Sequence, residues 1–384
     1  MPGLDPGWSR LVVVVGADRV SRTWHVLDNG TPDPVGTLLC VHGNPTWSYL
    51  WRGLLSAAPP GWRVIAPDQL GMGYSERLTA PRNLAERVAD LRALTETLDV
   101  AGPVVTVGHD WGGAVSLGWA LAAGTQLRAV VLANTAVAQP PGDHGPALIR
   151  LANLSVLRDA VCVRTPTFVR AATALSRPAL PAGIRDALAA PYGSASRRRS
   201  VGDFVADIPF AAGHPSRQAL EAIAAGVASL DVPALLLWGP RDPVFGQRYL
   251  RDLLQRLPHA DLHRYEGASH LLPEDAPEYA AAVARWVADL GAEPDDAPHE
   301  STRPRWASST TPEGPTPELA SRHTLWAALE RRTDDPSPAV VEVGGARVSW
   351  EALARRVRGL AAGLAAAGVR PGHRVALLVP PSAE

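Results

Sequence analysis

The feature that most constrains this chain is a buried-strand pattern that turns directly into a helix pattern, at residues 104–113, Val-Val-Thr-Val-Gly-His-Asp-Trp-Gly-Gly. The β-branched run is typical of a buried strand, and the small residues that follow, up to Ala123, predict a closely packed helix. Such a sharp turn presents one side chain at its apex, which here is Asp110. Its carboxylate is ionised at neutral pH and can attack carbon without an activating base. The alternative is an aspartate that only caps the helix.

Strand patterns alternate with helix patterns along the first 290 residues. Two antiparallel strands joined by a turn are expected at 11–15 and 20–27, and helices at 84–98 and about 277–290. Further strands are expected at 37–41, 64–66, 129–133, 234–238 and 262–265. Because strands separated by helices pair in parallel, this order predicts an α/β fold with a mostly parallel, doubly wound sheet covered on both faces.

Two stretches break this rhythm. Residues from about 139 to 230 hold helical pieces and no clear strand, which predicts a helical cap inserted over the carboxyl edge of the sheet as a lid. Within it, the basic run 197–199 is expected on a solvated surface. Residues 291–319 are rich in Pro, Ser, Thr and acids and have the composition of a disordered linker.

A further patterned segment follows the linker at residues 320–384. It is expected to hold helices at 322–331 and 350–367, a hairpin of 339–343 with 347–349, and a strand at 374–379. About sixty residues with one open-ended strand make a poor independent core. We therefore expect the start of a second domain whose remainder is missing.

Composition argues against several classes of function. The formal net charge is −1, which gives no indication of a nucleic acid or an anionic membrane as partner. Every basic residue is arginine, so a Schiff-base or P-loop lysine is excluded. Cys40 and Cys162 lie far apart, which indicates neither a disulfide framework nor a metal site and favours the reducing cytoplasm. Near the N-terminus, the apolar run 11–15 is too short for a signal segment or a transmembrane helix.

Three side chains that follow core strands form a candidate catalytic set: Asp110, Asp242 and His270. A histidine that relays protons needs a carboxylate on its other ring nitrogen to select the tautomer and stabilise the charged form, and Asp242 is expected there. The alternatives are an ion pair between Asp242 and Arg241, and a histidine at 270 that only bonds backbone. His109, next to the proposed nucleophile, is expected to point away from the pocket and pack.

An anion formed in such a reaction needs hydrogen-bond donors. The backbone N–H of Trp111 and one from the loop after His42-Gly43 are expected to form an oxyanion site. The side chains of Asn44 and Trp111 add an amide N–H and an indole N–H for a leaving halide or carboxylate. The alternatives are a turn asparagine and a core tryptophan, and His42 itself is expected to brace its loop.

Three motifs taken together resemble a known family. They are His-Gly-Asn-Pro-Thr at 42–46, Pro-Asp-Gln-Leu-Gly-Met-Gly-Tyr-Ser at 67–75, and Gly-His-Asp-Trp-Gly-Gly at 108–113. In this order they resemble the haloalkane dehalogenase and epoxide hydrolase branch of the α/β-hydrolases, over about residues 1–290. The resemblance implies Asp110 as nucleophile, His270 as base, Asp242 as acid, and Asn44 with Trp111 as leaving-group ligands. It implies no metal and no cofactor for this domain.

Two departures from the family pattern affect the assignment. Many dehalogenases carry their acid just after the strand that ends near Ala133, where this chain has Asn134-Thr135, so Asp242 must supply it. Asn44 replaces an aromatic residue common in epoxide hydrolases, and Tyr192 is a lone candidate for their lid tyrosine pair. Epoxide opening is therefore the weaker alternative.

The C-terminal segment carries a second resemblance. Residues 348–353, 360–364 and 368–378 resemble the opening of adenylate-forming acyl-activating enzymes, whose missing remainder would use ATP and Mg²⁺. A hydrolase linked to such a domain resembles the fused β-lactone decarboxylase and β-lactone synthetase of bacterial long-chain olefin biosynthesis.

This fusion implies that the first domain converts a lipid-like cis-dialkyl β-lactone into a cis-alkene and CO₂. The implied partners are the acyl-activating domain and the other olefin-pathway enzymes. A haloalkane dehalogenase is the second hypothesis, and a non-catalytic module that scaffolds the acyl-activating partner is the third.

Overall fold

The computed structural model describes residues 1–100, 102–139, 145–211, 213–290, 334, 336, 338–341 and 347–366. The chain divides into two compact units, Met1–Ala307 and Ser308–Glu384. The predicted linker at 291–319, the helix at 322–331 and the strand at 374–379 lie outside the described residues. The domain boundaries derived from the sequence stay a prediction.

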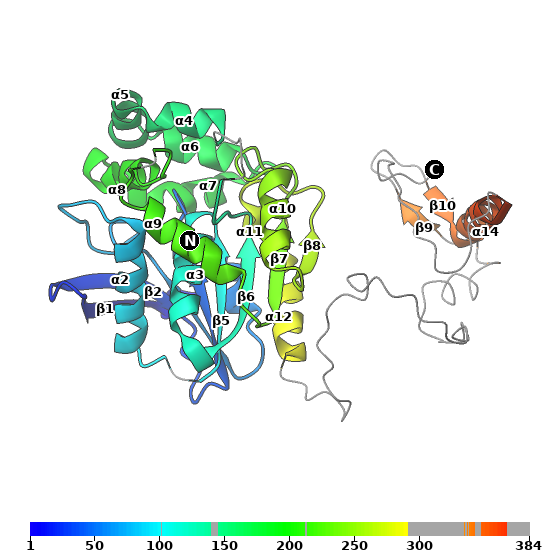
Figure 1. Cartoon of the computed structure of the whole chain (residues 1–384), viewed down its shortest axis with the longest axis horizontal. Helices are drawn as coiled ribbons and strands as arrows, with labels where there is room; N and C mark the ends of the chain where they lie inside the picture. Colours follow the sequence, from blue (N-terminus) through cyan, green and yellow to red (C-terminus); the bar gives the residue numbers. More distant parts are fainter. Residues whose placement is uncertain are drawn as a thin grey trace. The chain divides into compact units, whose positions relative to one another are not determined.

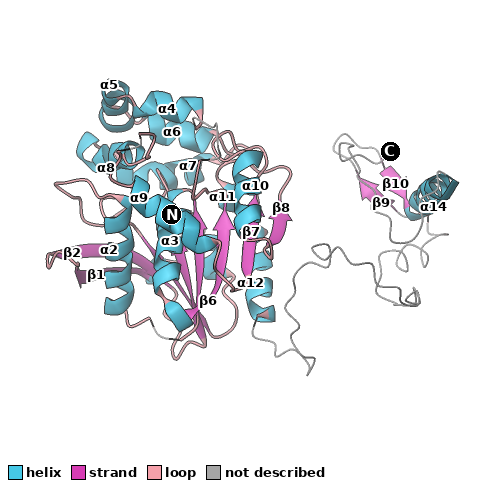
Figure 2. Ribbon diagram, in the orientation of Figure 1, coloured by secondary structure: helices cyan, strands magenta, loops and turns pink. Residues whose placement is uncertain are grey.

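An eight-stranded sheet forms the centre of the first unit (Figure 2). Its strands are β1 (Ser9–Val15), β2 (Ser21–Asp28), β3 (Gly36–Val41), β4 (Trp62–Pro67), β5 (Val104–His109), β6 (Leu127–Ala133), β7 (Ala234–Trp238) and β8 (Asp261–Arg264). They lie in the order β1-β2-β4-β3-β5-β6-β7-β8, and β2 pairs antiparallel with both β1 and β4. All other pairs are parallel. The predicted hairpin and the mostly parallel sheet are therefore confirmed.

Helices cover both faces of this sheet, as a doubly wound fold requires (Figure 2). The helices outside the region between β6 and β7 are α1 (Arg52–Ser56), α2 (Leu84–Thr97), α3 (Trp111–Ala122), α10 (Gln247–Arg256), α11 (Leu272–Asp275) and α12 (Tyr279–Asp289), with short 3₁₀ turns η1 (Pro6–Trp8), η2 (Ser48–Trp51) and η3 (Gly124–Gln126). One core cluster packs α2, α3 and α10 on one face, and a second packs α1 and α12 on the other. Strands β3 and β5 are buried along their whole length between the two, which explains their continuous apolar sequences.

The chain between β6 and β7 is helical and lies over the carboxyl ends of the strands (Figure 1). It comprises α4 (Ala147–Asn153), α5 (Ser155–Arg158), η4 (Asp159–Arg164), α6 (Thr167–Ala174), α7 (Ala182–Ala189), η5 (Ala190–Tyr192), α8 (Ala195–Ala206) and α9 (Arg217–Val227). A third apolar cluster joins the cap to the core, and the Trp47 indole donates to the Ala187 carbonyl at 3.1 Å. Helix α9 packs on α3 within the first core cluster and so supports the sheet as well as the cap.

The basic run 197–199 corrects one expectation. Arg197 and Arg199 are exposed, but Arg198 is buried, and its guanidinium donates to the carbonyls of Val163, Arg164 and Tyr192. Helical periodicity turns the middle residue of the run inward, and the carbonyls left at the ends of neighbouring elements satisfy its donors. Arg198 therefore ties the cap together and does not belong to a solvated surface.

The described part of the second unit contains an antiparallel pair, β9 (Pro338–Val341) with β10 (Arg347–Ser349), followed by α14 (Trp350–Ala366). The predicted hairpin and the helix after it are therefore confirmed. The resemblance to an acyl-activating enzyme stays a prediction, because most of the residues that carry it are outside the described part. Among the described residues, no helix has the length and apolarity to cross a bilayer.

Candidate active site

Asp110 occupies the bend between β5 and α3 with φ 54° and ψ −131°. This left-handed conformation is unusual for a residue with a side chain and stores roughly 1–3 kcal/mol of strain. Its carboxylate makes no N-capping hydrogen bond to α3, so the capping alternative is wrong. A Cβ at Gly43 would lie 2.2 Å from Asp110 Oδ1, and one at Gly113 would lie 2.1 Å from Thr135 Oγ1. The glycines of both motifs therefore make room for the aspartate and its turn.

His270 lies between two carboxylates. Its Nδ1 is 3.0 Å from Asp242 Oδ2, and its Nε2 is 3.9 Å from Asp110 Oδ2. All three side chains are buried. The Asp242 carboxylate thus pairs with His270 rather than with Arg241, and His270 presents its second ring nitrogen to Asp110. The geometry brings together the three residues that the sequence proposed.

Burial and charge oppose one another at this cluster. Burial lowers the pKa of His270, but the carboxylates of Asp242 and Asp110 outweigh it and raise that pKa to about 9. The pKa of Asp242 is lowered against its burial by His270 and by hydrogen bonds. Burial raises the pKa of Asp110, although His270 and the backbone N–H groups of Asn44 and Trp111 pull it back. The two aspartates thus favour the charged form of His270, whereas burial favours the neutral form of Asp110.

Asn134 is a site residue whose role sequence reasoning missed. Its Nδ2 donates to Asp242 Oδ2 at 2.8 Å and to the Gly239 carbonyl at 3.0 Å, and its Oδ1 accepts from the Gly239 N–H at 2.7 Å. The Val244 N–H donates to Asp242 Oδ1 at 2.7 Å. Asn134, which stands where many dehalogenases carry their acid, thus orients Asp242, which follows the neighbouring strand β7. Its position after β6, one strand from β7, was the only signal in the sequence.

Two further groups hold the backbone around His270. Asp275 accepts the Ser269 N–H at 2.7 Å and the Arg177 N–H at 2.9 Å, which links the histidine loop to the cap. His109 Nε2 lies 2.7 Å from the His270 carbonyl oxygen, and burial lowers the pKa of His109 to about 3. His109 is therefore neutral and supports the backbone behind the catalytic candidate. Nothing in the sequence motifs pointed to Asp275.

The predicted donors gather at Asp110. The Asn44 N–H donates to Asp110 Oδ1 at 2.9 Å, and the Asn44 side-chain Nδ2 donates to the Val201 carbonyl of the cap at 3.1 Å. An amide nitrogen carries two hydrogens, so one stays available to a ligand while the other fixes the side chain. Asn44 and Trp111 both line the cavity beside Asp110. Both residues therefore lie at the cavity wall next to Asp110, and their role as ligands of an anion stays a prediction.

A cavity of about 890 Å³ extends from this cluster into the cap. Asp110 and His270 line it together with mostly apolar side chains, among them Val137, Leu151, Leu157, Phe168, Val205 and Phe245. Phe245 stacks on the His270 ring with centroids 5.9 Å apart. A cavity of this size and polarity fits an apolar molecule that carries one reactive polar group.

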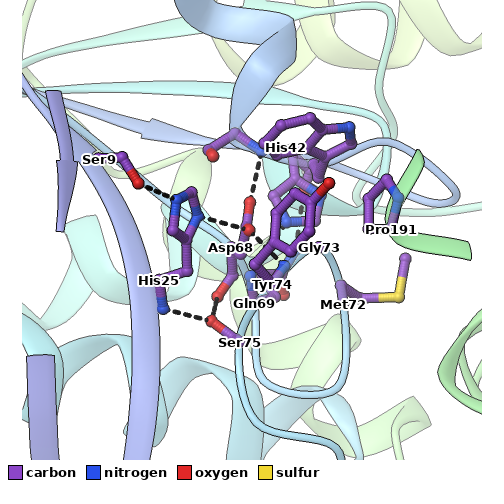
Figure 3. Close-up of polar contacts among 12 residues, drawn as sticks. Ser9, His25, His42, Asp68, Gln69, Met72, Gly73, Tyr74, Ser75 and Pro191 are labelled. Carbon is purple, nitrogen blue, oxygen red and sulfur yellow. Dashed lines mark hydrogen bonds and ion pairs between the residues drawn. The ribbon is translucent and has the colours of Figure 1, made fainter. Parts of the chain in front are cut away.

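The motif at 67–75 builds a second network of polar contacts, which includes His25 and His42 (Figure 3). Asp68 accepts the Ser48 N–H and the Tyr74 N–H, both at 2.7 Å, and pairs with His25 Nδ1 at 2.8 Å. The Gln69 N–H donates to His42 Nε2 at 3.0 Å. As expected, His42 braces the loop. The motif therefore has a supporting role, because none of these residues lines the cavity.

Tyr192, the candidate lid tyrosine, forms its hydrogen bonds outside the cavity. Its hydroxyl donates to the Thr46 carbonyl at 2.8 Å and accepts the Gly73 N–H at 3.3 Å, and it does not line the cavity. Within the described residues, no cluster of three or more His, Cys, Asp or Glu side chains is arranged to hold a metal ion. Cys40 and Cys162 are both buried free thiols.

Comparison with known protein sequences finds several relatives of this chain. The chain is 34% identical over 277 residues to the cis-3-alkyl-4-alkyloxetan-2-one decarboxylase of Xanthomonas campestris, a match that covers 67% of this chain and 90% of the relative. It is 31% identical over 265 residues to the enzyme of the same name from Shewanella oneidensis, covering 67% and 82%. It is also 31% identical over 264 residues to haloalkane dehalogenase 2 of Mycobacterium bovis, covering 67% and 89%.

Comparison with solved structures also finds haloalkane dehalogenases. The crystal structure of an ancestral haloalkane dehalogenase superposes with a TM-score of 0.66 at 25% identity, covering 73% of this chain and 99% of that one. The family profile described as "alpha/beta hydrolase fold" matches residues 36–277, which include all three proposed catalytic residues. The chain therefore belongs to the α/β-hydrolases, in their haloalkane dehalogenase branch.

Proposed function

We propose that this protein is a β-lactone decarboxylase that converts a cis-dialkyl β-lactone into a cis-alkene and CO₂. The observation that carries the proposal is the aspartate at the bend, 3.9 Å from His270, on the wall of an apolar cavity. The two relatives named as decarboxylases act on oxetan-2-ones, which are four-membered β-lactones. Ring strain makes such a lactone an electrophile that a carboxylate can open.

In the proposed reaction Asp110 acts as nucleophile. Attack at the ring carbon that bears oxygen breaks the C–O bond and leaves an alkyl ester of Asp110 and a free carboxylate. Loss of CO₂ then supplies the electron pair of the new double bond, and the aspartate leaves with its own electron pair restored. Attack at the carbonyl carbon would instead give an anhydride and an alkoxide. Either anion meets the donors of Asn44 and Trp111.

The charge state of His270 before the reaction suits the stabilisation of an anion beside Asp110. Asp242, oriented by Asn134, holds the imidazole protonated at neutral pH, and an imidazolium stabilises a neighbouring anion but cannot take a proton from water. Decarboxylation consumes no water overall. We assign His270 the stabilisation of charge beside Asp110, and Asp242 the maintenance of that cation.

A haloalkane dehalogenase is the second candidate, because Asn44 and Trp111 lie beside Asp110 as a halide site requires. Its hydrolytic step needs a neutral His270. Esterification of Asp110 removes one of the two charges that raise the histidine's pKa, so this step is chemically accessible.

The two candidates are separated by their products. We expect purified protein incubated with a cis-3,4-dialkyl β-lactone to yield the cis-alkene, measured by gas chromatography. Halide release from haloalkanes without alkene from the lactone would contradict the proposal and favour a dehalogenase. Turnover of neither substrate would favour the scaffold hypothesis.

We further propose that the second unit belongs to an acyl-activating β-lactone synthetase, which would use ATP and Mg²⁺ and would supply the lactone. The resemblance of residues 348–353 and 360–364 to such enzymes supports this placement in olefin biosynthesis. A cytoplasmic location agrees with two buried cysteines that are both free thiols.

A further inference from the structure

The cap presents an apolar surface to solvent at the cavity. Leu151 on α4, Leu154 between the helices, and Val156 and Leu157 on α5 are 53%, 58%, 80% and 37% exposed. We call these four residues the apolar tip. Figure 1 shows α4 and α5 at the end of the first unit farthest from its sheet. Large apolar side chains gathered in this way on a surface mark an interaction site.

The apolar tip is continuous with the cavity. Leu151 and Leu157 line the cavity and are also exposed on the outside, so one apolar surface runs from solvent towards Asp110. Leu154 and Val156 do not line the cavity. A hydrocarbon chain that touches the tip can therefore contact apolar side chains that also line the cavity.

The charge around the tip differs from that of the whole chain. Residues 145–178 hold five arginines and a single acid, Asp159, a net charge of +4 against −1 for the full sequence. Arg164 lies 2.5 Å from Asp159, while Arg150, next to Leu151 in the chain, and Arg170 on α6 are exposed. Exposed apolar side chains with basic residues around them are the composition of segments that lie in the headgroup layer of an anionic bilayer.

We propose that the apolar tip inserts into an anionic lipid surface, from which a dialkyl substrate enters the cavity. The part that concerns substrate rests on the proposed function. Binding of this kind is peripheral, because the apolar side chains enter only the boundary between headgroups and acyl chains. The local positive charge is attracted to lipid phosphates even though the whole chain is nearly neutral.

The test is flotation of the full chain with vesicles of phosphatidylcholine alone or mixed with phosphatidylglycerol. We expect binding to the mixed vesicles that weakens with salt, and a drop of at least about tenfold for the double variant Leu154→Asp/Val156→Asp. The matched control is Val13→Asp. Val13 lies on the exposed face of β1, is 64% exposed, and does not line the cavity.

Control and variant give opposite outcomes if the proposal holds. Val13→Asp should float like the unmodified chain. Equal losses in both variants, or no flotation of the unmodified chain, would overturn the proposal. A concentration-dependent dimer in sedimentation that only the tip variant dissolves, without flotation, would overturn it in favour of contact between two copies.

Activity separates this proposal from the proposed function. The tip variant should convert a short-chain, water-soluble β-lactone at the unmodified rate and lose at least about tenfold on a long-chain lactone embedded in vesicles. Flotation without conversion of either lactone would reject the decarboxylase and keep the lipid surface. Conversion of the soluble lactone without flotation would reject the lipid surface and keep the decarboxylase.

Discussion

In the described part of the first unit, His270 and His25 are both buried and each pairs through Nδ1 with a buried aspartate. The two pairs differ in the group that the second ring nitrogen faces. The pairs are similar in length, 3.0 Å for Asp242–His270 and 2.8 Å for Asp68–His25. His270 Nε2 faces Asp110 at the cavity, whereas His25 Nε2 lies 2.9 Å from Ser9 Oγ on the exposed edge strand (Figure 3).

The comparison teaches that an Asp–His pair is not a catalytic signature by itself. Ser9, His25 and Asp68 even have the residue types of a serine hydrolase triad. Asp68, however, accepts backbone N–H groups from two loops, and none of the three residues lines the cavity. The first pair is expected to govern the rate and the second the stability.

Replacing one aspartate in each region, Asp110 at the cavity and Asp68 in the second pair, should give the largest contrast. Asp110→Asn removes the nucleophile, so alkene formation should fall by at least about a thousandfold. Because burial raises the pKa of Asp110, loss of its charge should leave the unfolding free energy equal or higher. Asp68→Asn leaves buried donors unpaired and should cost about 3 kcal/mol in denaturant unfolding. Unchanged turnover in Asp110→Asn would reject the assigned nucleophile.

Replacing the two histidines also tests whether the first pair governs the rate and the second the stability, with smaller expected effects. His270→Gln should lower kcat by about a hundredfold. Its unfolding free energy should differ little from that of the unmodified chain only above about pH 9, where the contribution of the His270 cation is lost. His25→Gln should keep kcat and lose about 1–3 kcal/mol of stability, because its buried partners lose hydrogen bonds. A large fall in kcat for the folded His25 variant would break the comparison.

The pH dependence should report only the first pair. If the His270 cation is required, kcat/KM for the lactone falls about tenfold for each pH unit above pH 9. Hydrolysis of a haloalkane would instead gain rate as His270 becomes neutral. Since the folded pKa exceeds the unfolded value, the stability contribution of His270 is full below pH 6.5 and is lost as the pH rises through about 9. His270→Gln should flatten that part of the stability curve.

The smallest effect is expected at the exposed end of the second pair. Ser9→Ala should leave alkene formation unchanged and alter stability by less than about 0.5 kcal/mol, because water can replace the exposed hydroxyl. Ser9 in the unmodified protein should not react with a fluorophosphonate probe. If the probe labels the unmodified protein and Ser9→Ala abolishes the labelling, Ser9 is a nucleophile. Both Asp–His pairs would then belong to reactive sites, and the contrast between them would fail.

Much of the fold was readable because its signals are local. The β-branched runs of β3 and β5 predicted buried strands, and the alternation of strands with helices predicted a parallel sheet covered on both faces. The glycines around Asp110 marked the bend for the same reason, since a close approach of backbone excludes a Cβ.

The partners of the site residues were not readable. Asn134 and Asp242 are 108 residues apart and meet because β6 and β7 are neighbours in the sheet. Asp275 meets Arg177 of the cap across 98 residues of sequence. No local pattern records such contacts, which also explains why Arg198 was expected in solvent and lies buried among cap carbonyls.

The sequence alone determined the fold class and the identity of the chemical groups, because strand periodicity and a strained turn each depend on a few adjacent residues. Only the tertiary structure decided which histidine faces the cavity. Burial, distance and the sum of neighbouring charges set the protonation of His270, and those quantities arise only when distant segments are packed together.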